Sequence, residues 1–503
     1  MKWKKIIGSS EFKNIASFIT VIFWICLFYQ KINLPERISD RPTGEHVWAQ
    51  IDRASMALTY YQDDAPFLLP RCHQANYNME GITAGEFPLI PYTVSKLYSI
   101  FGFKEAYHRG FVLLVSIIGF LFSFLLALRL LKSYFWAVFS SVIWIASPNI
   151  IYYSASFLPD VPALAFVIIS VYFLFRNKTT PSIGDWICFA FFFSLAGLIR
   201  ASAILPISAI TLSYLISFNG NKLKGMKKKL VFCFACIIPL IFAISWIYYS
   251  KWVVNHYGIF TFLMSPVPPT SFKEFREGMT VFLARNDYFY INGFYYFLGI
   301  STLLGLIFIK RSNKFLILTT ILIYLSFFAL FITLFKKGFE HSYYWIPFQI
   351  GIFFHVCWLA DLARKIKIPT WSKAIVVIVA MIFINYNSIH VEKNVTRRWE
   401  YRRGLYSSYN DLEPYLDSLG IHYGSRVVSY NDPTFNNTLY LMNRKGWELD
   451  KGDGMDLFHK GLGSCQYAIL NDTNILQNPE LSVYFGDMMG VHGGLFIYSL
   501  KSR

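Results

Sequence analysis

The sequence predicts an α-helical protein that crosses a membrane many times and ends in a small soluble α/β domain. Three observations predict this fold class. Only 15% of the 503 residues are charged, whereas a soluble domain carries about a quarter. Apolar runs recur over the first 389 residues, as helices in a lipid environment require. The remaining residues are polar and contain many Gly, Asn and Asp turn residues.

Eleven apolar runs are the expected transmembrane helices. Several are shorter than the roughly 20 residues that a straight span needs. The two runs that flank Arg200 are either two short spans or one broken span. The runs cover residues 14–31, 110–127, 135–146, 162–175, 186–198, 203–218, 230–249, 293–309, 315–335, 343–362 and 374–389.

Basic residues separate the runs and indicate the orientation of the chain. With the N-terminus in the cytoplasm, every inner segment carries Lys or Arg, for example Arg129 and Lys132 in one segment and Arg176 in the next. This is the positive-inside pattern, and it places the C-terminal domain outside the cytoplasm. The same pattern accounts for the net charge of +17 without any nucleic-acid partner.

Two domains follow from this orientation. Residues 1–389 form the predicted transmembrane domain, with a first outer loop at 33–109 and a second large outer loop at 250–292. Residues 390–503 form the predicted extracytoplasmic α/β domain. Cys72 and Cys465 both fall in outer segments, where a disulfide between them can form. In the tail, strands are expected near 426–430, 467–470 and 495–499, and a helix near 411–419.

The first outer loop carries titratable side chains in a helical pattern. A helix is expected over residues 45–57. Glu45 and Asp52 are seven residues apart and would share one face of this helix. A purely structural loop beside a bilayer has no need of such titratable groups. The adjacent stripe of the expected helix consists of His46, Gln50 and Arg53.

A second acid, Glu86, precedes an amphipathic stretch in the same loop. Two acidic centres flanked by aromatic residues at a membrane surface suit a general base and an orienting or metal-binding acid. The alternative is that these carboxylates are simply solvated, and spacing alone does not separate the two interpretations for Asp52 and Glu86. For Asp63 and Asp64 we prefer a solvated turn.

Further candidates lie on the same predicted outer side. Asp160 opens an apolar run, where it serves either as a helix cap or as a site residue. Arg200 is costly near membrane depth and suits a lipid phosphate as its partner, whereas the alternative is a side chain that reaches to the interface. His341, Tyr343 and Tyr344 open another span, where they suit contacts to a sugar or phosphate. An ordinary aromatic belt would explain the tyrosines better than it explains His341.

An ordered set of short motifs resembles a known family. The first outer loop contains His46-Val-Trp48-Ala-Gln50-Ile-Asp52, Leu69-Pro70-Arg71 and Glu86-Phe87-Pro88-Leu89. Later in the chain are Phe157-Leu-Pro159-Asp160, Leu195-Ala-Gly-Leu-Ile-Arg200 and His341-Ser-Tyr343-Tyr344. The set resembles bacterial membrane glycosyltransferases of the GT-C class, the glycosyltransferase family 39-like relatives of protein O-mannosyltransferases and of the lipid A aminoarabinose transferase.

The resemblance implies a GT-C-like fold with about eleven transmembrane helices in the bacterial inner membrane. It implies a hexosyl- or pentosyltransferase whose donor is a sugar on a polyprenyl phosphate. The acceptor would be an envelope glycan such as lipopolysaccharide, another lipid, or a protein on the outer face. Some relatives use a divalent cation and others do not; oxygen ligands would suit Mg or Mn, and an added His would suit Zn.

The resemblance also implies roles for the residues above. Asp52 is the expected general base, with Glu45 as the runner-up, and Glu86 would orient the acceptor or help to hold a cation. Arg200 is expected to stabilise the leaving phosphate, with His341 and Tyr344 assisting. The further candidates for substrate binding are His46, Gln50, Arg53, Arg71, Asp160 and Tyr343.

The sequence departs from the family pattern at several positions. Ala49 and Arg53 stand where relatives often carry Arg and Thr, and Ser342 replaces an Asp. Glu45 lacks the Asp that precedes it in protein mannosyltransferases. These departures leave open whether Asp52 or Glu45 is the base, and they weaken any metal site near Ser342.

Other functional classes compete with a glycosyltransferase. A transporter or flippase would explain the spans and Arg200 but not the acids in the large outer loops. An O-antigen ligase or polymerase would use similar polyprenyl-linked glycans but lacks the early motifs of the first loop. A non-catalytic scaffold, with the tail as a binding module, is the third alternative.

Overall fold

The computed structural model describes residues 10–75, 80–176, 182–217, 226–259, 266–284, 294–338, 341–365, 370–401, 406–409 and 411–501. Contacts divide the chain into two compact units built from interleaved segments. The helical unit comprises Met1–Ile38, Arg109–Trp246 and Ser265–Arg398. The α/β unit comprises Ser39–His108, Ile247–Met264 and Trp399–Arg503. The domain boundary that the sequence predicts between residues 389 and 390 stays a prediction.

Helices long and apolar enough to span a membrane confirm the polytopic architecture. The described residues contain five such helices, and a sixth span results if the bent pair Tyr134–Ile145 and Pro148–Ser154, at 73°, counts as one. Shorter apolar helices add to these, so the count of eleven stays a prediction. The five are Glu11–Lys31, Glu105–Leu131, Met226–Tyr257, Lys314–Thr333 and Ser342–Lys365.

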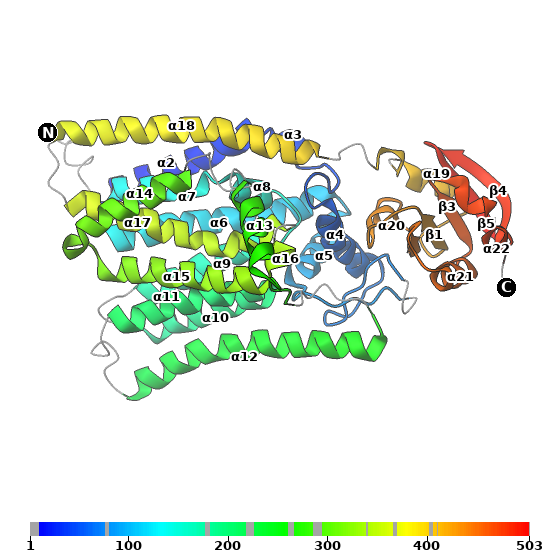
Figure 1. Ribbon diagram of the computed structural model, residues 1–503, viewed down its shortest axis with the longest axis horizontal. Helices are drawn as coiled ribbons and strands as arrows, with labels where there is room; N and C mark the ends of the chain where they lie inside the picture. Colours follow the sequence, from blue (N-terminus) through cyan, green and yellow to red (C-terminus); the bar gives the residue numbers. More distant parts are fainter. Residues whose placement is uncertain are drawn as a thin grey trace. The chain divides into compact units, whose positions relative to one another are not determined.

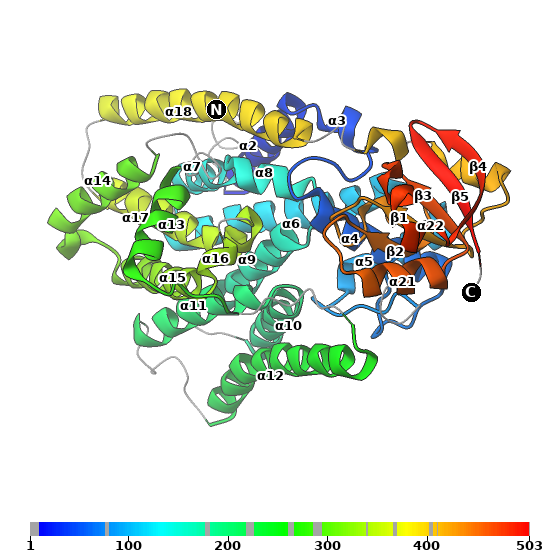
Figure 2. The same cartoon turned by 45° about the vertical axis from the view of Figure 1, so that its right-hand side comes forward.

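The helical unit is a bundle of helices that lie side by side (Figures 1 and 2). Its centre is α9, where 13 of 17 residues are buried, and α9 packs along α10. Neighbouring pairs are α11 with α15, α15 with α17, α17 with α7, and α7 with α2. The helices are α2 (Ser10–Lys31), α3 (Leu34–Arg37), α6 (Glu105–Leu131), α7 (Tyr134–Ile145), α8 (Pro148–Ser154), α9 (Asp160–Arg176), α10 (Ile183–Ile199), α11 (Ile204–Ser217), α12 (Met226–Tyr257), α13 (Phe272–Ala284), α14 (Phe294–Ile307), α15 (Lys314–Thr333), α16 (Phe335–Gly338), α17 (Ile350–Lys365) and α18 (Thr370–Glu400).

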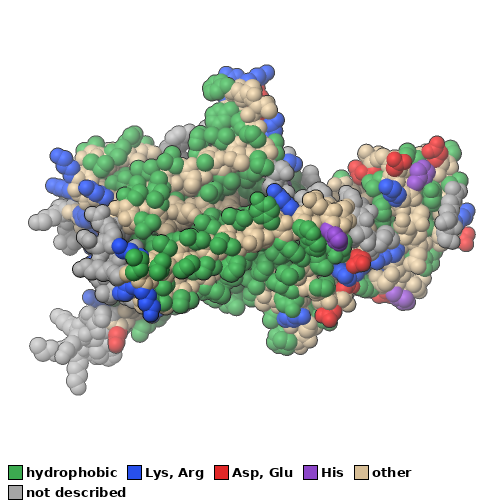
Figure 3. Space-filling model, turned by 90° about the horizontal axis from the view of Figure 1, so that it is seen from below, with side chains coloured by type: hydrophobic (Ala, Val, Ile, Leu, Met, Phe, Trp, Pro, Cys, Tyr) green, Lys and Arg blue, Asp and Glu red, His purple; other side chains and the backbone are tan. Residues whose placement is uncertain are grey.

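The surface of the helical unit has the charge distribution of a membrane protein. Lys and Arg side chains gather at its left-hand end in Figure 3, and the surface next to them is mostly hydrophobic. Exposed basic residues occur where α12 and α15 begin and where α6, α9 and α17 end. Large apolar side chains remain exposed along α12, for example Phe234, Ile241 and Phe242. Such a surface is stable in lipid rather than in water.

Arg200 separates two helices, which answers the question that the sequence left open there. Helix α10 ends at Ile199, Arg200 adopts an extended backbone, and a single 3₁₀ turn (Ala201–Ala203) leads into α11. The flanking runs are therefore two short helices. Two other helices are longer than predicted, because α12 continues to Tyr257 and α18 continues to Glu400.

The α/β unit contains a five-stranded sheet in the order β2-β1-β3-β5-β4. Strands β2 and β3 pair with β1 in parallel, whereas β5 pairs antiparallel with β3 and β4. The predicted strands and the predicted helix near 411–419 are present, whereas β2 and β4 were not predicted. The elements are α4 (Val47–Gln62), α5 (Leu89–Phe101), α19 (Leu412–Ser418), β1 (Arg426–Tyr430), α20 (Asn437–Leu441), β2 (Lys445–Leu449), α21 (Met455–Ser464), β3 (Tyr467–Leu470), α22 (Pro479–Ser482), β4 (Phe485–His492) and β5 (Leu495–Leu500).

The first outer loop and the C-terminal tail fold together within the α/β unit. Gln74 forms a parallel bridge with Gly446, and the two segments exchange backbone hydrogen bonds: Ala75 N donates to Gly446 O (2.7 Å) and Gly446 N to His73 O (3.1 Å). The loop thus extends the sheet beyond β2. A Cβ atom at position 446 would lie 1.7 Å from the Val427 carbonyl oxygen, so only glycine fits.

Two expectations about individual side chains are wrong. Asp63 is not simply a solvated turn residue, because it forms an ion pair with Lys445 and accepts a hydrogen bond from the Tyr423 hydroxyl (2.9 Å). Cys72 and Cys465 do not form a disulfide, since both are free cysteines buried at different places in the unit.

Candidate active site

Helix α4 positions the acids of the first loop, but it begins later than predicted. It starts at Val47. Gly44 and His46, on either side of Glu45, have positive φ angles of 86° and 57°. Glu45 therefore precedes the helix, and the expectation that it shares a helical face with Asp52 is wrong. Its Oε1 atom is 3.5 Å from Nε2 of His46.

Asp52 is the acid best placed to act as a base. It lies on α4, with 4% of its surface exposed. Oδ2 is 3.7 Å from Nη1 of Arg53, and Oδ1 has no hydrogen-bond partner among the described residues. Burial raises the pKa of Asp52 to about 7. The nearby charge of Arg53 lowers this pKa, whereas the charge of Glu86 raises it further. A carboxylate with this pKa is ready to take a proton near neutral pH.

Arg53 connects Asp52 to the second predicted acid, Glu86. Its Nη2 atom forms an ion pair with Oε2 of Glu86, and its Nη1 atom donates to the Ala49 carbonyl (3.3 Å). Both ionic side chains are largely buried, at 8% and 16% exposed. The structure thus brings together three of the predicted site residues, as a carboxylate–guanidinium–carboxylate series.

The loop that carries Glu86 is held in place by α12. The Ser250 hydroxyl donates to the Gly85 carbonyl (3.2 Å), and Val253 packs against Ile82 and Ala84. These contacts hold the backbone next to Glu86. No sequence pattern indicated this support, since it joins segments more than 160 residues apart.

The other first-loop candidates have structural contacts. Gln50 donates from Nε2 to the carbonyls of Thr43 and Glu45 (3.1 Å each), so it holds the turn before α4. His46 packs edge-on against Trp48, with ring centroids 5.1 Å apart. Arg71 pairs with Glu80 (2.9 Å) at the exposed side of the loop. Their roles in substrate binding stay predictions.

A second group of predicted residues meets in the helical unit. Arg200 donates from Nε to Oδ1 of Asp160 (2.6 Å) and from Nη2 to Oδ2 (2.8 Å). Its guanidinium also lies over the rings of Tyr343 (5.2 Å) and Tyr344 (5.5 Å). Asp160 is fully buried and Arg200 is 9% exposed, so the two charged groups pair with each other inside the helical unit.

His341 and Ser342 border this group. Nδ1 of His341 is 3.3 Å from the Tyr343 hydroxyl, and its ring contacts that of Tyr344 at 5.0 Å. The Ser342 hydroxyl, at the position where relatives carry Asp, is hydrogen-bonded to the Tyr153 hydroxyl (2.8 Å). The 3₁₀ segment Ser342–Gln349 thus attaches to α8.

Arg398 is a buried cation of the helical unit that the sequence reasoning missed. It is 2% exposed, donates from Nη1 to Oδ1 of Asn149 (2.9 Å), and lies over the rings of Tyr152 and Tyr153. The signal for it was the pair Arg397 and Arg398, which begins eight residues after the last apolar run. That pair was assigned to the soluble tail because α18 is longer than its apolar part.

A metal site built from protein ligands alone does not fit the described residues. They contain no group of three or more His, Cys, Asp or Glu side chains that could hold a metal ion. The carboxylates of Asp52 and Glu86 have Arg53 close by, which already supplies the positive charge. We therefore derive no step through a metal.

Comparison with known proteins confirms the resemblance that the motifs indicate. Residues 86–249 match the sequence profile of the dolichyl-phosphate-mannose-protein mannosyltransferase family. ArnT from Cupriavidus metallidurans has the same fold: the apo structure has a TM-score of 0.63 at 14% identity, with 98% of each chain covered. Its complex with undecaprenyl phosphate gives 0.62 at 12% identity, covering 96% of this chain and 97% of that chain.

A larger enzyme shares the fold over part of its length. The arabinofuranosyltransferase AftD from Mycobacteria matches with a TM-score of 0.54 at 12% identity, covering 98% of this chain and 40% of AftD. No curated protein matches at the sequence level. The chain is thus similar to GT-C membrane glycosyltransferases, and it is an integral membrane protein with an ArnT-like fold and a small C-terminal sheet.

Proposed function

We propose that the protein is a membrane glycosyltransferase that moves a sugar from a polyprenyl phosphate to an acceptor hydroxyl. One observation carries the proposal: a buried carboxylate, Asp52, has a pKa of about 7 and an oxygen without a hydrogen-bond partner among the described residues. It occurs in a chain with the fold of ArnT, which has been solved with undecaprenyl phosphate bound. A structural carboxylate would instead be paired through both oxygens.

In the proposed reaction, Asp52 removes the proton of the acceptor hydroxyl as its oxygen attacks the anomeric carbon of the sugar. The new bond is from that oxygen to the anomeric carbon, and the bond from this carbon to the phosphate oxygen breaks. The lipid phosphate leaves with the electron pair. Glu86 acts through Arg53 to position the acceptor side, and Glu45 remains the second candidate for the base.

The leaving phosphate needs a positive partner in a site that excludes water. Arg200 is our candidate, because Asp160 holds it through two hydrogen bonds and so fixes the direction of its remaining contacts. His341 and Tyr344 would assist, since the guanidinium lies over the Tyr344 ring and that ring contacts the ring of His341. Arg398 joins this list as another buried guanidinium of the same unit.

The proposed setting is the inner membrane of a bacterium. We propose about eleven spans, a cytoplasmic N-terminus and an extracytoplasmic C-terminal domain, on the basis of the basic clusters between the apolar runs. The acceptor would then be an envelope glycan, a lipid or a protein on the outer face. The proposal needs no nucleotide sugar, because the lipid phosphate itself carries the sugar.

The test is transfer of labelled sugar from polyprenyl phosphates to envelope acceptors by the purified full-length protein. We expect transfer by the wild type and at least a hundredfold lower rate for Asp52→Asn. Asp64→Asn is the matched control, because Asp64 is an exposed acid just after the same helix. Full activity of a folded Asp52→Asn protein would remove the base assignment. Movement of intact lipid without any transfer would replace the proposal with a flippase.

A further inference from the structure

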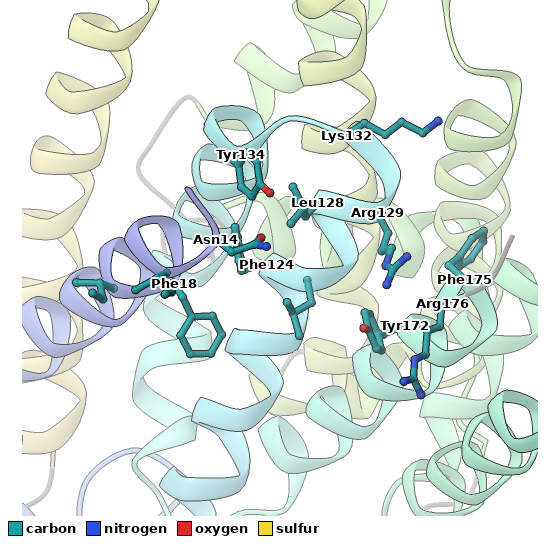
Figure 4. A pocket seen from close by; sticks show the side chains of 13 residues that line it. Asn14, Phe18, Phe124, Leu128, Arg129, Lys132, Tyr134, Tyr172, Phe175 and Arg176 are labelled. Carbon is teal, nitrogen blue, oxygen red and sulfur yellow. The ribbon is translucent and has the colours of Figure 1, made fainter. Parts of the chain in front are cut away.

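One cavity of the helical unit is lined by none of the residues proposed for catalysis. It has a volume of about 880 Å³ and lies between α2, α6, α7 and α9 (Figure 4). This volume falls within the range of sites that bind drug-sized or larger ligands. Neither the reaction proposed above nor the motifs of the first loop make any use of it.

The polar lining of this cavity has a single sign of charge. Arg129, Lys132 and Arg176 line it together with Asn14, Tyr134 and Tyr172, and its described lining contains no Asp or Glu. Figure 4 shows the guanidinium groups of Arg129 and Arg176 on the same side of the cavity, with Tyr172 between them in this view. Two guanidinium groups and phenolic hydroxyls are the donors that bind a phosphate group well.

Arg176 keeps donors for such a ligand although an acid lies nearby. Its Nη1 atom is 3.5 Å from Oδ1 of Asp185, which is a loose ion pair. Asp185 is also the N3 residue of the capping box of α10, in which Ser182 is the N-cap and Oδ2 of Asp185 accepts hydrogen bonds from the Ser182 backbone and hydroxyl. Half of the Arg176 side chain remains exposed, so a phosphate can approach it from the cavity.

The remaining wall of the cavity is apolar and faces outward. Phe18, Phe124, Leu128 and Phe175 line it, and Ile15 and Ile19 of α2 are each 60% exposed. A soluble anion gains nothing from contact with such a wall, whereas an acyl chain can pack against it. The combination of a basic end and an apolar side matches an amphiphile with an anionic head.

The position along the helices agrees with a membrane surface. Helices α6 and α9 end beside the cavity at Leu131 and Arg176, and α2 and α7 begin there at Ser10 and Tyr134. Asp160 stands at the other end of α9, 16 residues from Arg176, which corresponds to roughly 24 Å along the helix axis. The cavity is therefore separate from the Asp160–Arg200 pair.

We propose that this cavity binds the phosphate headgroup of an acidic membrane phospholipid, with an acyl chain along α2. The lipid would bridge the basic ends of α6 and α9 to α2. Its occupancy would stabilise the bundle and would not depend on whether the protein transfers a sugar. A soluble phosphate ligand and a phospholipid would both offer a phosphate group to the arginines. The apolar wall favours the phospholipid, because only its acyl chain can pack against that wall.

The test measures lipid binding by native mass spectrometry and thermal unfolding of the full-length protein in detergent. The probes are dioleoyl phosphatidylglycerol, dioleoyl phosphatidylcholine and inorganic phosphate. We expect retained phosphatidylglycerol and a raised unfolding temperature with that lipid alone. The double variant Arg129→Gln/Arg176→Gln should bind it roughly thirtyfold more weakly, since each basic contact near a lipid headgroup contributes about fivefold.

The matched control is Lys310→Gln/Arg311→Gln, which removes the same charge from the exposed turn before α15. It should bind phosphatidylglycerol as the wild type does. Equal losses in both double variants would overturn the proposal, because they would indicate attraction by net charge alone. Equal stabilisation by inorganic phosphate would also overturn it in favour of a soluble ligand. Arg129→Gln alone keeps the Arg176–Asp185 pair and decides the matter if the double variant fails to fold.

Discussion

Asp160 binds Arg200 through two parallel hydrogen bonds, from Nε to Oδ1 at 2.6 Å and from Nη2 to Oδ2 at 2.8 Å. This geometry orients a planar guanidinium more strictly than a single contact would. The effect of substituting either residue therefore includes the loss of the ion pair for its partner. Any substitution of Arg200 leaves a buried carboxylate at the start of α9, and any substitution of Asp160 leaves a buried cation beside two tyrosines.

Removing one partner of this pair should cost more stability than removing both. We expect Arg200→Gln to lower the free energy of unfolding by about 3 to 5 kcal/mol, because an uncompensated buried charge remains. The double variant Asp160→Asn/Arg200→Gln should recover part of this loss. Thermal unfolding in detergent measures both. Equal destabilisation by the single and double variants would show that the pair does not act as a unit.

The rate of sugar transfer should depend on pH through Asp52. Its pKa of about 7 means that the carboxylate, the form able to accept a proton, becomes the major form only above neutral pH. The rate should therefore be about tenfold lower at pH 6 than on the plateau above pH 8. A rate that does not change between pH 6 and 8 would contradict the assignment of Asp52 as the base.

The same shift has a consequence for stability with the opposite sign. Because the pKa of Asp52 is raised on folding, protonation favours the folded state, and its contribution to stability is lost as the pH rises from about 4 to about 7. Asp52→Asn should therefore be more stable than the wild type at pH 8 and similar to it at pH 4. Denaturation at both pH values checks this difference without any substrate.

Glu86 and Arg53 should move the pH midpoint in opposite directions. Glu86 raises the pKa of Asp52 and Arg53 lowers it. We expect Glu86→Gln to shift the midpoint of the rate profile to lower pH and Arg53→Gln to shift it to higher pH. A residue that only supports the fold would lower the rate without moving the midpoint, so the direction of each shift distinguishes the two roles.

Transfer should not require an added divalent cation. The described residues offer no group of three His, Cys, Asp or Glu ligands, and Arg53 already supplies a positive charge between two carboxylates. Activity should therefore persist after treatment with EDTA, with and without restored Mg, Mn or Zn. A loss of activity that one of these ions restores would show that the substrate phosphate completes a metal site.

Local patterns in the sequence predicted the helices better than the site. Apolar runs and basic clusters are properties of short segments, so the polytopic bundle and the strands at Arg426–Tyr430 and Tyr467–Leu470 followed from them. Strand β2 was missed because its sequence, Lys-Gly-Trp-Glu-Leu, does not alternate, although all five residues are buried. The sheet buries polar side chains there, against the usual preference for apolar ones.

The relationships between site residues depend on tertiary structure. Arg53 and Glu86 are 33 residues apart, and Asp160 and Arg200 are 40 apart, so no local pattern joins them. The motifs identified each residue as a candidate, yet not its partner. The prediction for Glu45 failed in the opposite way. Helical spacing paired it with Asp52, but His46 has a positive φ angle, so the helix begins only after Glu45.

The ion pair between Asp63 and Lys445 should decide whether the first loop stays attached to the sheet. Both side chains are only 11% exposed, and the Tyr423 hydroxyl donates to the same carboxylate. Burial lowers the pKa of Lys445, and Asp63 opposes this effect, so removing the acid leaves an unfavourable buried ammonium. We expect Asp63→Asn to destabilise the protein by about 3 kcal/mol, near the lower limit for a broken buried pair.

The control Asp64→Asn, at the exposed neighbouring position, should change stability by less than about 0.5 kcal/mol. Hydrogen exchange would locate the effect: faster exchange of the Ala75 and Gly446 amides in Asp63→Asn would show that the loop detaches from β2, whereas unchanged exchange would show that the backbone bridge is sufficient without the ion pair.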